Sequence, residues 1–106
     1  MAFNLNRKGT FKSDVSINVP VNEGTVTETI KVEFKRLSTD ELKKAQRGGD
    51  ASLLREVVAG WDGVTNDGAP VPFTPENLEA FLQVPTAVRA TALTYAQDIL
   101  GIREKN

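Results

Sequence analysis

Two runs of alternating apolar and polar residues constrain this chain more than any other feature of its sequence. The first run places one set of side chains on one side, at Phe11, Ser13, Val15, Ile17 and Val19. The second run does the same with Val26, Glu28, Ile30, Val32 and Phe34. A period of two and many β-branched residues are typical of half-buried strands. Turn residues at 20–24 separate the runs, so the sequence predicts an antiparallel β-hairpin over residues 10–36.

The rest of the chain predicts short helices separated by glycine and proline. Helix starts are indicated by capping residues or by proline at the first helical position, at Ser38, Asp50, Thr74 and Pro85 or Thr86. The second helix is expected to run from Ala51 to about Ala59 and to end at Gly60. A lone hairpin is marginal in water, so its apolar face is expected to pack on the helices. The sequence therefore predicts an α+β fold, with an N-terminal antiparallel β-hairpin packed on a C-terminal bundle of about four short helices.

We expect one domain over residues 1–106, because a chain of 106 residues buries enough surface for one core and not for two. Residues 1–9 are expected to form a flexible lead-in to the hairpin, and 38–102 to form the helical part. Residues 103–106 are expected to be a frayed tail.

The sequence contains no histidine and no cysteine, which removes the commonest general base, the commonest metal ligand and all thiolate chemistry. Asp62 and Asp67 miss the spacing of a calcium loop, since its twelfth position would be Phe73. Carboxylate pairs such as Asp40 and Glu41 lie where the start of a helix favours acids. We therefore expect no catalytic residue, no cofactor site and no metal site, and a protein that is not an enzyme.

Charge and hydropathy exclude two classes of partner. The net charge is −1, and neither half of the chain has the basic patch of a nucleic-acid-binding protein. No apolar run approaches the roughly 20 residues that span a bilayer, and the first residues lack the apolar core of a signal peptide. We expect no nucleic-acid partner, no membrane partner and a cytoplasmic location.

Residues 57–73 contain the only tryptophan of the chain and a turn signal, Asn66-Asp67-Gly68, with apolar residues on both sides. This pattern predicts a small hairpin folded back onto the core. Trp61 is interpreted as a core residue whose indole N–H binds a loop carbonyl, with an exposed partner anchor as the alternative. We expect a structural clasp that joins two helices and is formed by Trp61, Asp67, Gly68 and Phe73.

The same region carries a family resemblance. The run from Val57 to Val64, the turn with Asp67-Gly68, and residues 70–78 resemble the signature of phage tail assembly chaperones of long-tailed bacteriophages and prophages. Residues 32–37, before an acidic helix start, and the closing helix with its charged tail are also similar to that family. The resemblance covers roughly residues 10–106.

The resemblance implies a small α+β protein of tail morphogenesis without catalytic residues. Such chaperones bind the tape measure protein, keep its long helices soluble and help tail-tube subunits to gather on it. The resemblance places the protein in the cytoplasm of the bacterial host and leaves it out of the mature virion. Many members are also made as a longer frameshifted product, and this sequence would be the short form.

The predicted hairpin has outer edges that are open to another strand, from a partner or from a second copy. We expect partner contacts there, at Val26, Glu28, Ile30 and Lys31. Because members of the family tend to self-associate, a homo-oligomer through this edge is also expected. Two other functions stay open: a structural tail or head–tail connector subunit retained in the virion, and a small enzyme that uses carboxylates alone.

Overall fold

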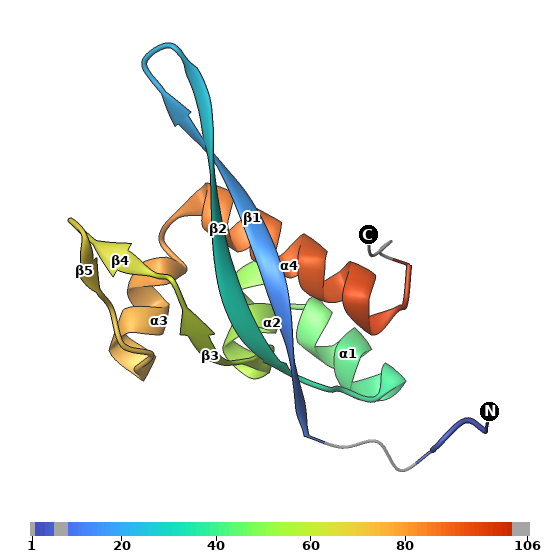
Figure 1. Ribbon diagram of the computed structural model, residues 1–106. Coiled ribbons are helices and arrows are strands. Elements are labelled where there is room, and N and C mark those ends of the chain that lie inside the picture. Colours follow the sequence, from blue (N-terminus) through green and yellow to red (C-terminus); the bar gives the residue numbers. More distant parts are fainter. Residues whose placement is uncertain (1, 6–8, 103–106) are drawn as a thin grey trace.

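The structure of the protein, a computed structural model, describes residues 2–5 and 9–102. Its elements are β1 (Thr10–Val21), β2 (Gly24–Lys35), α1 (Thr39–Gln46), α2 (Asp50–Val57), β3 (Val58–Asp62), β4 (Thr65–Asn66), β5 (Ala69–Pro70), α3 (Pro75–Phe81) and α4 (Pro85–Ile99). The α+β fold with an N-terminal antiparallel hairpin and four helices after it is confirmed (Figure 1). The predicted frayed tail, 103–106, and residues 1 and 6–8 of the predicted lead-in lie outside the described residues.

The β1–β2 hairpin is the largest element pair of the fold. Its register is continuous from the Thr10–Lys35 pair to the Val21–Gly24 pair, so the chain reverses through Asn22 and Glu23. The alternation seen in the sequence therefore keeps the same set of side chains on one face along the whole hairpin. Nearer the body this face packs against the helices, and the opposite face is exposed to solvent. Figure 1 shows that the turn end of the hairpin projects well beyond the helices.

The sequence did not predict β3, and this strand changes the architecture. The helix expected to reach Ala59 ends at Val57, and the chain from Val58 on pairs antiparallel with β2 in a sheet of order β1-β2-β3. A register shift at Glu33 and Phe34 accommodates the new strand. Backbone pairing with an open strand edge thus prevails over the local helical pattern.

The helices begin where the sequence predicts, with one exception. Ser38 accepts the backbone N–H of Glu41, whose carboxylate accepts the N–H of Ser38, so the capping box is present. Thr74 caps α3, and proline is the first residue of α3 and of α4. The exception is α2, which starts at Asp50 itself after Gly49 at a φ of 90°. Glycine is required there because other residues rarely adopt that conformation.

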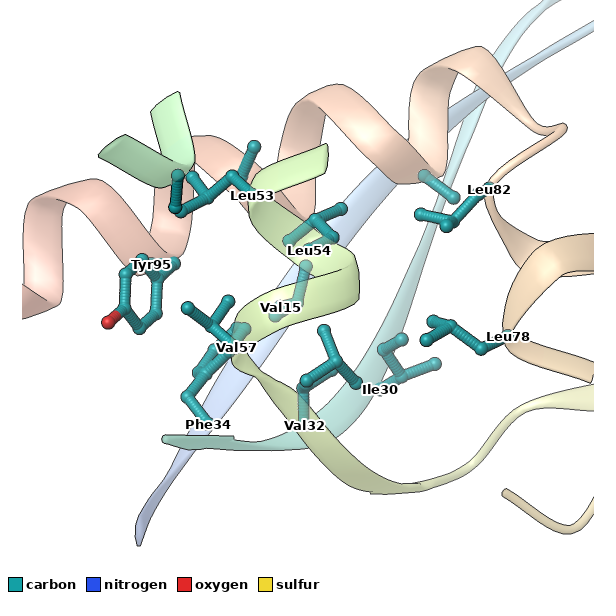
Figure 2. Packing of buried hydrophobic residues seen from close by; sticks show 14 of the residues in the cluster. Val15, Ile30, Val32, Phe34, Leu53, Leu54, Val57, Leu78, Leu82 and Tyr95 are labelled. Atoms are coloured by element: carbon teal, nitrogen blue, oxygen red, sulfur yellow. The ribbon is translucent and has the colours of Figure 1, made fainter. Parts of the chain in front are cut away.

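The core lies between the inner face of the sheet and the helices α2 and α4 (Figure 2). The strands contribute Val15, Val32 and Phe34, and α2 contributes a stripe of Leu53, Leu54 and Val57. Tyr95 of α4 is fully buried; its ring centroid is 5.1 Å from that of Phe34, and its hydroxyl donates to the carbonyl of Lys35 at 2.9 Å. Leu78 of α3 and Leu82 after it extend the core on the side of α3 (Figure 2). None of the helices in the described part of the chain has the length and apolar character to cross a membrane.

Candidate interaction surface

The small hairpin of β4 and β5, named the central hairpin, has the tight turn that the sequence predicts. β4 and β5 pair antiparallel, and the two residues between them, Asp67 and Gly68, have φ values of 51° and 84°. Positive φ at both central positions is the requirement of a type I′ turn, which asparagine, aspartate and glycine satisfy best. The backbone N–H of Val71 donates to the carbonyl of Val64 at 2.9 Å and continues the pairing.

Trp61 holds this hairpin against the body of the protein. Its indole N–H donates to the carbonyl of Val71 at 2.8 Å. Its ring lies edge-on to Phe73 at a centroid distance of 5.0 Å and tilted against Phe81 of α3 at 5.3 Å. Of the four residues expected in the clasp, Trp61 and Phe73 are therefore in direct contact, while Asp67 and Gly68 form the exposed turn at the far end of the hairpin.

The hairpin of β1 and β2 extends past the end of β3. The last β2 residue opposite β3 is Lys31, which pairs with Asp62, and Gly63 then turns the chain away at a φ of 98°. Residues 17–28, which lie beyond this point, are named the arm. Ile17, at the base of the arm, is buried in the core, and the turn end of the arm projects from the body in Figure 1.

The inner face of the arm is the continuation of the face that builds the core. Val15 and Ile17 are 0% and 7% exposed, but Val26 and Val21 are 46% and 49% exposed. Val19 lies opposite Val26 on the same face and is half-buried. An apolar surface therefore starts under the helices and runs out into solvent along the arm.

The outer face of the hairpin is polar and linked across the two strands. Thr27 donates to Asn18 at 2.8 Å, and the hydroxyls of Ser16 and Thr29 lie 3.3 Å apart. Nearer the body, Lys31 forms an ion pair with Asp14 at 3.1 Å. Cross-strand polar pairs of this kind stabilise a hairpin modestly and leave its other face available for packing.

The four residues expected to contact a partner are divided by the structure. Val26 and Glu28 are exposed on the inner face of the arm, whereas Ile30 is only 7% exposed and belongs to the core. Lys31 is exposed on the outer face. Val21 is a further exposed residue of this face and lies in the predicted turn, 20–24. Its sequence signal is that it continues the alternation that ends in Val19.

A shallow hollow of about 360 Å³ lies between α1 and α2, and its lining residues are Leu37, Glu41, Lys44, Ala45, Ser52 and Glu56. Its best-placed carboxylate is already engaged: hydrogen bonds from Ser38 hold the pKa of Glu41 below its ordinary value. Among residues 2–5 and 9–102, no three acidic side chains gather as a metal site would require. The hollow is lined by both polar and apolar side chains.

Comparison with known proteins bears on the origin of the chain. A family model described as YdaY prophage protein matches residues 26–106, which is most of the sequence. The chain belongs to the YdaY prophage protein family. A phage or prophage origin, which the sequence resemblance also implies, is thereby supported. A search of curated proteins found no match, and a search of solved structures found none either.

The match to the YdaY prophage family begins in the arm. Its first residue, Val26, lies on the exposed part of β2, and the matched region continues through the central hairpin and all four helices. Trp61 and Phe73 both fall within it. The matched region thus includes three residues of the arm, 26–28, and the complete structural clasp.

Proposed function

We propose that this prophage protein is a non-enzymatic tail assembly chaperone that binds the tape measure protein and assists assembly of the tail tube. The proposal places it in the cytoplasm of the bacterial host during assembly and outside the mature virion. The resemblance of residues 57–78 to tail assembly chaperones supports the proposal, and the phage or prophage origin is compatible with it.

The observation that carries the proposal is the arm. A chaperone needs exposed apolar surface on a body that stays folded without its partner. Here the body has its own core, with Tyr95, Phe34 and Leu54 fully buried, and the arm carries exposed Val21 and Val26 outside that core. Binding of a partner on the arm therefore requires no opening of the folded body.

Co-expression with a tape measure protein of the same prophage tests the proposal. We expect the tape measure protein to be mostly insoluble when it is expressed alone, since long apolar stripes aggregate when unpaired. We expect it to become soluble and to co-purify when this protein is present. The measurement is the soluble fraction of the tape measure protein after centrifugation, with an unrelated small α+β protein as the co-expression control.

Two outcomes would contradict the proposal. Equal solubility of the tape measure protein with this protein and with the unrelated control removes the chaperone function. Detection of this protein at stoichiometric amounts in purified phage particles by mass spectrometry would instead identify a structural tail or head–tail connector subunit.

A further inference from the structure

We propose that the inner face of the arm, formed by Val19, Val21, Val26 and Glu28, is the docking site for one amphipathic helix with a basic flank. The inference rests on the proposed function, because it names the surface through which the partner is bound. It commits to a helical segment of another protein as the occupant, in place of an added strand or a second copy of this chain.

The helical nature of the occupant follows from what already covers this face. Nearer the body, the same two strands pack against helices: α4 lies on β1, and α2 contributes Leu54 and Val57 to the cluster that buries Val15. The exposed valines of the arm form the next rows of the same apolar face. A helix that packs on the arm beside α4 would therefore contact an apolar strand surface like the one that α4 covers.

The dimensions of the arm fit a single helix. Strands rise about 3.4 Å per residue, so the distance from Ile17 to Val21 is roughly 14 Å, and two paired strands are about 5 Å apart. A helix with its side chains is about 10–12 Å across. One helix that crosses the arm therefore covers the Val19–Val26 pair and Val21, and no room remains for a second.

The charge of the arm defines the polar flank of the occupant. Between Asp14 and Lys31 the sequence has two charged residues, Glu23 and Glu28, and both are acidic and exposed. Glu28 lies opposite Ile17, next to the apolar rows, and Glu23 lies at the turn. A helix with lysine or arginine beside its apolar stripe complements both carboxylates, whereas a second copy of the arm would bring four acids together.

Binding of arm variants to the tape measure protein tests the inference. The double variant Val21→Asp/Val26→Asp places charges on the inner face, and we expect affinity to fall more than about 100-fold, because two apolar contacts are lost and two charges are desolvated. The matched control is Thr25→Asp/Thr27→Asp, which adds the same charge to the outer face of the same strand pair. The control is expected to bind within about 3-fold of the unchanged protein, as surface substitutions usually do.

Variants of Glu28 test the basic flank of the proposed helix. We expect Glu28→Gln to weaken binding by about 2- to 5-fold and Glu28→Lys to weaken it more, with both differences reduced at high salt. Overlapping peptides of the tape measure protein then identify the bound segment. Mixing it with this protein is expected to increase the helical circular dichroism signal at 222 nm.

Each contrary result has a distinct meaning. If the unchanged protein does not bind the tape measure protein, the proposed function fails and the docking site falls with it. If the unchanged protein and the Val21→Asp/Val26→Asp variant bind equally well, the docking site is wrong while the proposed function stands. Light scattering that shows a dimer of the unchanged protein and a monomer of this variant would assign the arm to a second copy and overturn the inference. An increase in the β-strand circular dichroism signal when the bound peptide is mixed with this protein would overturn the inference as well.

Discussion

At the scale of single residues, two aromatic side chains each combine burial with one polar contact to the backbone. Trp61 donates its indole N–H to Val71 and so holds the central hairpin. Tyr95 donates its hydroxyl to Lys35 and so ties α4 to the end of β2. Each residue is the only one of its type in the sequence, which makes both contacts accessible to spectroscopy.

Substitution of Trp61 by phenylalanine removes its hydrogen bond together with part of its ring packing. Phenylalanine keeps an aromatic ring near Phe73, but the carbonyl of Val71 loses its donor. We expect the free energy of unfolding to fall by about 1–2 kcal/mol. Urea unfolding followed by circular dichroism measures this change. An unchanged unfolding midpoint would show that the contact with Val71 does not stabilise the fold.

The burial of Tyr95 predicts that the free energy of unfolding decreases at alkaline pH. Burial of its hydroxyl raises the pKa of Tyr95 above its ordinary value of about 10. Because the folded pKa is the higher one, the neutral hydroxyl contributes stability that is fully present below the unfolded pKa and is lost as the pH rises through the folded pKa.

Absorbance at 295 nm measures the titration of this single tyrosine. We expect a midpoint above that of the urea-unfolded protein, together with a decrease in stability over the same alkaline range. In the Tyr95→Phe variant that part of the pH dependence should be absent. Equal midpoints for the folded and unfolded protein would contradict the burial of this hydroxyl.

At the scale of elements, the helices are joined by few polar contacts, and one of them links α2 to α3. Arg55 donates from Nε and Nη2 to the two carboxylate oxygens of Glu79 at 2.8 and 2.9 Å. Both side chains are about half exposed, at 49% and 51%. The pair therefore orients α3 more than it stabilises the whole fold.

The Arg55–Glu79 pair predicts an acid dependence of stability. The hydrogen bond from Arg55 lowers the pKa of Glu79 below its ordinary value. A lowered pKa contributes stability above the unfolded pKa, about 4.3, and this stability is lost as the pH falls through the folded pKa. We expect Glu79→Gln to be less stable than the unchanged protein at pH 7 and equally stable at pH 2.5. Parallel stability curves of the two proteins from pH 7 to pH 2.5 would argue against the pair.

The elements differ in how well they could be predicted from the sequence. Alternation and caps predict β1, β2 and the starts of α1, α3 and α4, because these signals are local. β3 has no such signal: it has five residues, includes Gly60, and acquires strand conformation only through pairing with β2. Residues that pair across 24 to 31 positions of the sequence cannot be recognised from a local pattern.

The same limit applies to the candidate surface. Val26 and Ile30 lie on the same face of the same strand, and the sequence gives no reason to separate them. Only the positions of the helices and of β3 leave Val26 exposed and bury Ile30. The extent of the arm is therefore a property of the tertiary structure.

At the scale of the whole molecule, the principal extents are 49, 32 and 24 Å, and the arm projects from the body (Figure 1). The body keeps its own core without the outer rows of the arm, since Val21 and Val26 are about half exposed while Val15 and Ile30 are buried. We therefore expect the arm and the body to contribute separately, the arm to the proposed binding and the body to folding.

Shortening of the arm tests this separation. We expect a variant in which residues 18–27 are replaced by a two-residue Asn-Gly turn to fold cooperatively, because that turn suits a hairpin. Its melting temperature should fall by no more than about 8 °C, the change that corresponds to about 1 kcal/mol in a domain of this size. Loss of cooperative unfolding would show that the arm is part of the folding core.

The most direct measurement of the central claim uses the purified components. The tape measure protein is diluted from denaturant, and its aggregation is followed by light scattering in the presence of the unchanged protein, of the arm-shortened variant, or of neither. We predict that an equimolar amount of the unchanged protein suppresses the scattering and that the arm-shortened variant does not. Scattering that rises equally in all three samples would contradict the account.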